Sequence, residues 1–274
     1  MKMTFLGVGS FFANGIDDFH SNILLENDEG KSFLIDAGTD LKVSIAKANK
    51  KIENIDSIYI SHEHGDHCGA LEYLGFYSRF ITKKKINFYS THRMAYDLWD
   101  ENLRGSMEIV DHGVVKVTDY FNVIDQDYLD TFSWSGLDFE VIPMPHIPID
   151  SYSFWSVPSY GLFIKSPKNK ILITTDTFYT YGLESRYLDP KPHIDRIKRA
   201  YEEADIIFHD CETYGLVNPP GSDVHAHYEE LVKFDSRLKN KIWLYHYQNL
   251  KERLPSAIVD GFRGFVTAGQ EFEI

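Results

Sequence analysis

Apolar positions along the chain fall into short alternating or continuous runs, a pattern typical of β-strands. Polar turns join two pairs of these runs, which predicts hairpins at residues 23–35 and 160–175. The alternating stretch 56–61 predicts a strand that leads into a histidine-rich segment, and further strands are expected at 205–208 and 242–245. The chain is therefore rich in strands in both of its halves.

Helical patterns stand between the expected strands. Thr39 or Asp40 can cap a helix that runs to about Lys50. The other expected helices span residues 71–80, 93–102, 194–203 and 228–234. Strand-rich halves that are each followed by helices fit two sheets packed face to face with helices outside. No Pro-, Gly- or Ser-rich linker divides the 274 residues, so one domain over 1–274 is predicted.

One short segment concentrates metal-binding chemistry. His62, His64, Asp66 and His67 follow the expected 56–61 strand directly. Neutral imidazole and carboxylate are the ligands that zinc and its neighbours prefer. His62 and His64 can point toward one ion, while Asp66 and His67, beyond the Gly65 bend, can turn toward a second. A solvated histidine-rich loop is the alternative interpretation, and ligand-type residues elsewhere in the chain argue against it.

Three such residues, His146, Asp176 and His246, each follow an apolar strand, which puts the chemistry on loops held by a rigid sheet. The pattern HxHxDH, followed by His, Asp and His at later strand ends, resembles the metallo-β-lactamase-fold hydrolases. The resemblance extends from Met3–Gly7 through Leu34–Gly38 to His246. It implies an α/β protein with the αββα four-layer sandwich of that fold.

The resemblance also implies two divalent ions, with zinc as the default and manganese or iron as alternatives. Asp176 would bridge the ions, because two dications roughly 3.5–4 Å apart need an anion between them. A hydroxide between the ions would be the nucleophile, since coordination lowers the pKa of water to about 7. Asp66 is counted as catalytic as well as a ligand. The first ion would be held by His62, His64 and His146, and the second by Asp66, His67 and His246.

Charge narrows the choice of substrate. The chain has 28 Lys and Arg against 41 Asp and Glu, a net charge of −13. A protein that holds long nucleic acid usually presents a basic face to the phosphates. We therefore expect a small-molecule phosphodiester and no long nucleic acid. The sequence shows neither a secretory signal nor a run of roughly 18 apolar residues, so a cytoplasmic protein without a membrane partner is expected.

A histidine outside the ligand set favours phosphodiester chemistry. In the RNase Z-like phosphodiesterase branch of the fold, a histidine that opens a helix upstream of the last ligand serves as the proton donor. His225 lies 21 positions before His246, which resembles that branch. A departing alkoxide needs a proton, and His225 can supply it. His227 is the alternative donor and a candidate substrate contact, while two ordinary surface histidines at a helix start are the plainer interpretation.

The interval between His146 and Asp176 points the same way. True RNase Z enzymes carry a long tRNA-gripping arm between the third and fourth ligand motifs, and only 30 positions separate the two residues here. Aromatic side chains in this interval can stack on a base, although a hydrophobic lid or a dimer contact fits equally well. The candidates for this role are Tyr152, Phe154 and Trp155. These features resemble arm-less cyclic nucleotide phosphodiesterases, among them the phage-type anti-Pycsar enzymes, which act as homodimers.

The function implied is a di-metal phosphodiesterase that hydrolyses a 3′,5′-cyclic nucleotide by attack of the bridging hydroxide, with His225 as general acid. Tyr179 is a candidate substrate contact, because a tyrosine three residues after the bridging aspartate polarises substrate in the acyl-homoserine lactonase branch. A lactonase is therefore the enzymatic alternative, and an RNase Z-type tRNA 3′ endonuclease is another. An inactive scaffold is the non-enzymatic alternative, and the complete ligand set argues against it.

Overall fold

The computed structural model describes residues 1–13, 18–91, 93–126, 130–147, 157–181, 191–213, 224–248 and 254–274. These residues form two compact units, and each unit is built on its own seven-stranded sheet. Unit 1 comprises Met1–Gly7, Phe19–Asp130 and Ala268–Glu273, and unit 2 comprises Val8–Asp18, Thr131–Thr267 and Ile274. The single domain over 1–274 stays a prediction.

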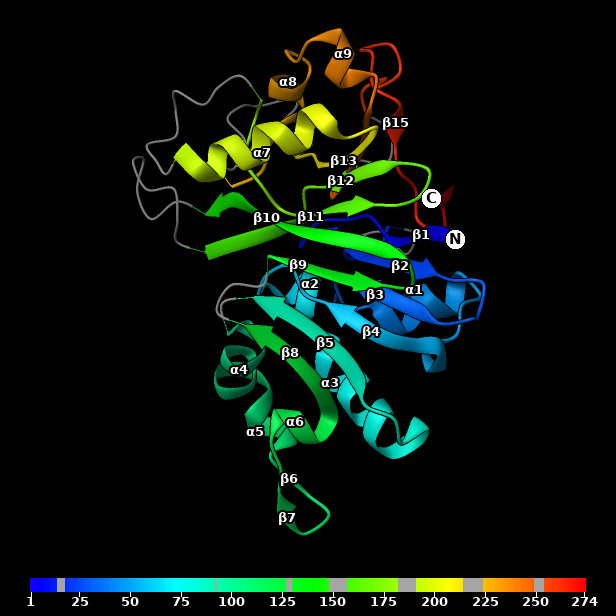
Figure 1. Cartoon of the computed structure of the whole chain (residues 1–274), viewed down its shortest axis with the longest axis vertical. Coiled ribbons are helices and arrows are strands. Elements are labelled where there is room, and N and C mark those ends of the chain that lie inside the picture. The colour runs from blue at the N-terminus through cyan, green and yellow to red at the C-terminus, as the bar shows by residue number, and fades with distance from the viewer. Residues whose placement is uncertain are drawn as a thin grey trace. The chain divides into compact units, whose positions relative to one another are not determined.

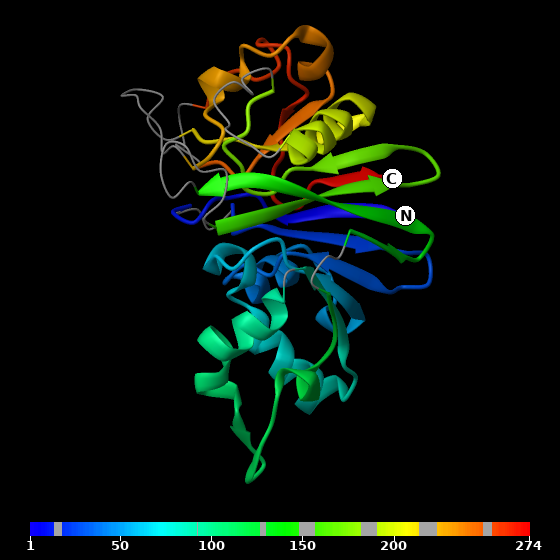
Figure 2. The ribbon, with the colours of Figure 1, turned by 60° about the vertical axis from the view of Figure 1, so that its left-hand side comes forward.

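The sheet of unit 1 has the strand order β16-β1-β2-β3-β4-β5-β8. Its strands are β1 (Lys2–Gly7), β2 (Asn22–Glu26), β3 (Ser32–Ile35), β4 (Ile55–Tyr59), β5 (Ile86–Thr91), β8 (Phe121–Gln126) and β16 (Glu271–Glu273). The hairpin expected at 23–35 is confirmed as β2 and β3. Strands β3, β4, β5 and β8 run parallel, so their carboxyl ends lie at one edge of the sheet. The first and last strands of this unit pair side by side, Lys2 opposite Glu273 (Figures 1 and 2).

Short helices connect the strands of unit 1. They are α1 (Leu41–Lys47), α2 (Gly65–Cys68), α3 (Leu71–Phe76), α4 (Met94–Leu98), α5 (Arg104–Met107) and α6 (Val117–Tyr120), with the 3₁₀ turn η1 (Ile52–Asn54) and the π-helical segments η2 (Tyr77–Thr82) and η3 (Trp99–Leu103). A small hairpin, β6 (Ile109–Val110) and β7 (Gly113–Val114), extends away from α5 and α6 (Figure 1).

The expected helix ends in unit 1 need correction. The helix expected to reach Lys50 ends at Lys47, and Asp40 at its N-cap accepts the backbone N–H of His20 instead of capping the helix. The helices expected at 71–80 and 93–102 begin as α3 and α4 and continue as the π-helical segments η2 and η3. Apolar periodicity does not distinguish these closely related windings, which is why the sequence shows one helix in each place.

The sheet of unit 2 has the strand order β15-β14-β13-β12-β11-β10-β9. Its strands are β9 (Thr131–Trp134), β10 (Leu137–Ile147), β11 (Val157–Lys165), β12 (Lys170–Ile173), β13 (Ile206–Asp210), β14 (Ile242–Tyr245) and β15 (Gly264–Phe265). The hairpin expected at 160–175 is confirmed as β11 and β12. Strands β12 to β15 run parallel, so the segments after β12, β13 and β14 leave the same edge.

The helices of unit 2 are α7 (Lys191–Glu203), α8 (Tyr228–Leu231) and α9 (Ser236–Lys239). Helix α7 lies along the sheet (Figure 1) and buries Ile197 and Tyr201 in one core cluster with Leu172 and Leu244. Removing such side chains from water stabilises the fold by about 1.5–3 kcal/mol each. The helix expected at 228–234 ends at Leu231. Among the described residues, no helix is both long enough and apolar enough to cross a bilayer.

Candidate metal centre

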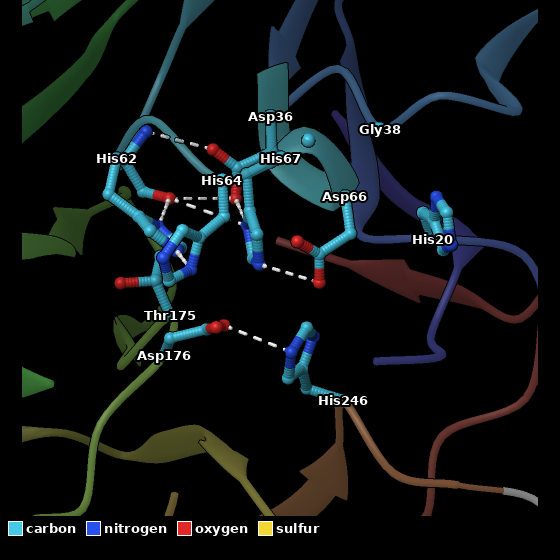
Figure 3. Close-up of polar contacts among 12 residues, drawn as sticks. His20, Asp36, Gly38, His62, His64, Asp66, His67, Thr175, Asp176 and His246 are labelled. Carbon is cyan, nitrogen blue, oxygen red and sulfur yellow. Dashed lines mark hydrogen bonds and ion pairs between the residues drawn. The ribbon is translucent and has the colours of Figure 1, made fainter. Parts of the chain in front are cut away.

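The histidine-rich segment of unit 1 leaves the carboxyl end of β4 and bends into α2, with His64 as the N-cap residue (Figure 3). His62 and His67 are wholly buried, and Asp66 is 2 % exposed. His62 Nε2 lies 3.0 Å from His64 Nδ1, and Asp66 Oδ2 lies 3.5 Å from His67 Nε2. The structure thus places the four residues as two adjacent pairs of ligand atoms.

Asp36, directly after the neighbouring parallel strand β3, orients this segment (Figure 3). Its Oδ2 lies 2.7 Å from His67 Nδ1 and also accepts the Ser61 hydroxyl at 3.0 Å, while its Oδ1 accepts the Ser61 backbone N–H at 2.8 Å. A carboxylate on Nδ1 fixes the proton there, which leaves the Nε2 lone pair of His67 for a metal. A Cβ at Gly38 would lie 2.4 Å from the Asp66 carbonyl oxygen, so only glycine fits between Asp36 and the ligand segment.

In unit 2, Asp176 lies between two imidazoles. It follows β12, while His146 is the next-to-last residue of β10 and His246 follows β14. Asp176 Oδ2 is 3.6 Å from His146 Nε2. Asp176 Oδ1 is 3.2 Å from His246 Nε2 (Figure 3). All three residues are 1 % exposed. Each carboxylate oxygen therefore faces a different imidazole, which is the arrangement that a bridging carboxylate needs.

These separations test whether a small dication fits. Zinc with bonds of about 2.1 Å in tetrahedral geometry holds neighbouring ligand atoms about 3.4 Å apart. The four ligand pairs, two in each unit, are 3.0, 3.5, 3.6 and 3.2 Å apart. Imidazole and carboxylate are also the donor types that such ions take. The residues of each unit therefore fit a divalent metal ion.

His225 lies beside the unit 2 ligands, with its ring centroid 5.2 Å from that of His146 and 5.3 Å from that of His246. Its Nδ1 is 2.8 Å from Oδ2 of Asp210, the last residue of β13. The Thr177 backbone N–H donates to the same oxygen at 2.8 Å. Asp210 Oδ1 is buried and has no hydrogen-bond partner among the residues that the structure describes. Asp210 thus holds His225 through Nδ1 and leaves Nε2 for another partner.

Electrostatics keep the proton on His225. Burial lowers the pKa of its imidazole, but the charge and hydrogen bond of Asp210 outweigh that effect and raise the pKa to about 10. Dications on the neighbouring ligands would lower it again. Asp210, His225 and His246 also offer three ligand atoms within 4.8 Å of one another, so the same geometry can serve a proton or a metal.

One ligand, His246, and two residues beside the ligand groups adopt the left-handed backbone region just after a strand. They are Asp36 (φ 61°), Thr175 (φ 54°) and His246 (φ 59°). Asp and His enter this region more easily than most residues, whereas a β-branched residue such as Thr175 rarely does. Strained backbone of this kind collects at functional sites, where it turns a side chain to a required direction. Here it turns Asp176, which follows Thr175, and His246 toward each other.

The other residues singled out in the sequence have mixed outcomes. His225 does not open a helix, because α8 begins at Tyr228 and its N-cap is His227. The His227 Nδ1 accepts the Glu229 backbone N–H at 3.3 Å, so its capping role is visible and its substrate contact stays a prediction. Tyr179 is wholly buried in the core of unit 2 with its ring against Tyr201, a position that fits packing better than substrate contact. The aromatic candidates Tyr152, Phe154 and Trp155 lie outside the described residues.

Sequence reasoning missed the positioning role of Asp36 and the buried Glu212. Asp36 directly follows the apolar stretch that ends at Leu34-Ile35, and a lone acid after an apolar strand was the available signal. Glu212 is 3 % exposed, and its backbone N–H donates to Ala226 at 2.8 Å, beside His225. No local pattern marks Glu212, because its burial depends on contacts with residues far along the chain.

The fold and its ligand residues define a class, the metallo-β-lactamase-fold hydrolases. YhfI of Bacillus subtilis, a solved metallo-β-lactamase-fold protein, matches with a TM-score of 0.69 and 14% identity over 99% of this chain and 98% of that chain. Zn²⁺-bound PqqB of Methylobacterium extorquens matches with a TM-score of 0.67 and 12% identity, covering 100% of both chains. These likenesses confirm the predicted α/β fold, the αββα metallo-β-lactamase fold.

The particular family follows from sequence. The family model of the anti-Pycsar protein Apyc1 matches residues 1–272, and the chain belongs to this family. The anti-Pycsar protein Apyc1 of Paenibacillus harenae is 30% identical over 248 residues, 90% of either chain. That of Bacillus phage 010DV004 is 24% identical over 99% of this chain and 98% of its own. With its family and its metal-ligand residues, the chain is a metal-dependent hydrolase of the phosphodiesterase type.

Proposed function

We propose that the enzyme hydrolyses a 3′,5′-cyclic nucleotide and uses two divalent cations, zinc by preference. Membership of the anti-Pycsar family supports this substrate, because cyclic mononucleotides are the signals that the resemblance implies. The acidic balance of the chain, −13, favours a small anion that is neutralised locally over a long polyanion.

The proposed ligand sets are those expected from the sequence. His62, His64 and His146 bind one ion, Asp66, His67 and His246 bind the other, and Asp176 is shared. The two oxygens of Asp176, each directed at a different imidazole, support the shared role. When bound, the ions supply Lewis acidity, which activates water and offsets negative charge on the phosphodiester oxygens. Asp66 is catalytic in this sense, because it holds one of the ions.

His225 is the proposed general acid, and its contact with Asp210 is the observation that carries the proposal. Asp210 accepts from Nδ1, so the imidazolium presents its Nε2–H to the leaving ribose oxygen. When that proton leaves, Asp210 holds the neutral ring in the tautomer that can be protonated again at Nε2. A second general acid is not required, because hydrolysis of one cyclic phosphodiester bond releases one alkoxide.

The leaving group provides a sharp test of this role. We expect His225→Gln to lower turnover of a 3′,5′-cyclic nucleotide by about 10²- to 10⁴-fold. The ribose alkoxide of this substrate needs a proton in order to leave. Turnover of bis-p-nitrophenyl phosphate should fall far less, because p-nitrophenolate leaves without one. His112→Gln, at an exposed histidine of unit 1, is the control and should keep both rates. Equal losses of His225→Gln on both substrates, or loss of metal by elemental analysis, would show that His225 binds metal instead.

A substrate panel separates the alternatives. It contains purine and pyrimidine 3′,5′-cyclic nucleotides, precursor tRNA and an acyl-homoserine lactone, all tested with one zinc-loaded preparation. Cleavage of cyclic nucleotides alone is the expected result. Lactone opening without phosphodiester cleavage would remove the proposal, and the buried position of Tyr179 argues against that outcome.

We also propose a homodimer, as the resemblance implies. A shallow apolar hollow of about 620 Å³ on unit 1 supports it, and its lining includes Tyr73, Phe76, Tyr77, Phe80 and Ile81. Phe80 is 42 % and Ile81 is 65 % exposed. A second copy of the chain would remove this surface from water, which stabilises an interface by about 25 cal/mol per Å² of apolar area.

A further inference from the structure

A tight turn just after β1 presents two phenylalanines to solvent. The Ala13 backbone N–H donates to the Ser10 carbonyl at 2.9 Å, so Phe11 and Phe12 occupy the two corner positions of a β-turn. Phe11 is 55 % and Phe12 is 76 % exposed, and their rings meet edge to face with centroids 5.1 Å apart. Corner positions usually hold Gly, Pro, Asn, Asp or Ser, each for a backbone reason that phenylalanine does not share. Turn geometry therefore does not explain these two side chains.

The turn is attached to the strand end that carries the last metal ligand. The Tyr247 backbone N–H donates to the Val8 carbonyl at 3.2 Å, and the Ser10 backbone N–H donates to the Tyr247 carbonyl at 3.4 Å. Tyr247 directly follows His246 and is itself fixed, since it is 3 % exposed and its hydroxyl donates to the Val266 carbonyl at 2.9 Å. All of these residues belong to unit 2. The turn that carries the phenylalanine pair is thus hydrogen-bonded to a buried residue, Tyr247, that directly follows the ligand His246.

We propose that Phe11 and Phe12 form the platform on which the base of the nucleotide stacks. The inference rests on the proposed function, and it assigns base recognition to the turn at 10–13. A nucleotide held by its phosphate at the metal ligands leaves its base as a flat apolar face. Exposed aromatic rings on a turn that is hydrogen-bonded to the residue after His246 offer a matching surface. Two phenylalanines donate and accept no hydrogen bonds, so the platform selects for ring area and not for base identity. Purine substrates are then favoured over pyrimidines, with no sharp discrimination within either class.

The test compares substrates that differ only in the base. One is a purine 3′,5′-cyclic nucleotide, and the other is the same cyclic ribose phosphate with a methoxy group in place of the base. The proteins are the zinc-loaded wild type and Phe11→Ala, Phe12→Ala and the double variant. Loss of stacking should lower kcat/KM for the purine substrate by about 5- to 100-fold, mainly through KM, and leave the base-free substrate unchanged.

Two controls make the result specific. Phe12→Trp keeps an aromatic face, so its KM for the purine substrate should equal that of the wild type or be lower. Tyr96→Ala removes an exposed aromatic ring of unit 1, 39 % exposed, and should change neither substrate. Sedimentation of each variant reports its oligomeric state.

The outcomes distinguish a failure of the proposed Phe11–Phe12 platform from a failure of the proposed hydrolysis of cyclic nucleotides. A selective loss on the purine substrate, with the mass of the wild type, supports the platform. Equal losses on both substrates, a change of mass, or no loss on either substrate overturns it, and a change of mass assigns the pair to contact with a second copy. A wild type that cleaves neither cyclic phosphate overturns the proposed function itself and the platform with it.

Discussion

At the scale of single residues, Asp210 connects the core of unit 2 to the proposed proton donor. It is wholly buried at the end of β13, and it joins the Thr177 backbone to the His225 ring through one oxygen. A carboxylate in that position fixes both the tautomer and the direction of the imidazole, as partners of catalytic and metal-binding histidines commonly do. Asp210 acts through His225 and is therefore a positioning residue.

Asp210→Asn should lower turnover of the cyclic nucleotide by about 10- to 100-fold while zinc content stays unchanged. The amide keeps the shape of the side chain but no longer stabilises the charged imidazolium. Asp205→Asn is the matched control, because Asp205 directly precedes the same strand and accepts the exposed Lys170 backbone N–H at 2.8 Å. Turnover and zinc content, the latter by elemental analysis, are measured for both variants. Equal turnover of the two would show that Asp210 has no part in the mechanism.

His209, next to Asp210, makes stability depend on pH. Its Nδ1 donates to the Asp210 carbonyl at 2.6 Å, so its Nε2 accepts from the Tyr201 hydroxyl at 2.6 Å. Burial lowers the pKa of His209 to about 4, against 6.5 for the ordinary group. Between these two pH values the unfolded chain binds a proton that the folded chain does not. Folding stability is therefore lost as the pH falls from about 6.5 to about 4.

His209→Gln should reduce this dependence. The free energy of unfolding of the wild type should exceed that of the variant most at pH 7, and the difference should shrink by about 3 kcal/mol as the pH reaches 4. Urea denaturation at several pH values measures the difference, in which effects common to both proteins cancel. A difference that stays constant with pH would mean that His209 keeps an ordinary pKa in the folded protein.

At the scale of elements, parallel strands explain why so much of the ligand set was visible in the sequence. His62, Asp176 and His246 each follow an apolar strand. Short apolar runs are the clearest indication of a strand that a sequence offers. The segment with His225 was harder to predict, because it is held by long-range backbone hydrogen bonds and is not part of a helix. The Ala226 N–H donates to the Thr177 carbonyl at 2.7 Å, and the Ala226 carbonyl accepts from Glu212 at 2.8 Å. Such contacts leave no periodic trace in the sequence.

Helix α8 supports the same segment through its first residue, Tyr228, whose hydroxyl donates to Asp260 at 2.5 Å. Burial and the neighbouring carboxylate raise the pKa of Tyr228 well above its usual range, so this hydroxyl stays protonated. Tyr228→Phe should lower the melting temperature by about 2–4 °C and also lower turnover several-fold, since His225 lies three residues away. Tyr181→Phe loses a comparable bond, to Glu202 at 2.8 Å, away from His225, and should keep wild-type turnover. Matching losses of turnover in both variants would show general destabilisation only.

At the scale of the whole molecule, the proposed homodimer can be tested through the apolar hollow on unit 1. Ile81→Glu places a charge where the second copy would pack, and the mass in sedimentation should fall from two chains to one. Ile109→Glu on the β6–β7 hairpin is the control, because Ile109 is also exposed, at 75 %, but does not line the hollow. A dimer that survives Ile81→Glu would place the interface on another surface.

The pairing of β1 with β16 has a consequence for synthesis on the ribosome. Lys2 and Glu271, which form an ion pair across these neighbouring strands, are 269 residues apart in the chain. At about 5–20 residues per second, roughly 15–50 s pass between the emergence of the two strands. During that time one edge of the β1 strand has no partner, and open edges invite pairing with other chains. Because β16 has only three residues, few backbone hydrogen bonds must form once it emerges, and their formation covers the open edge of β1.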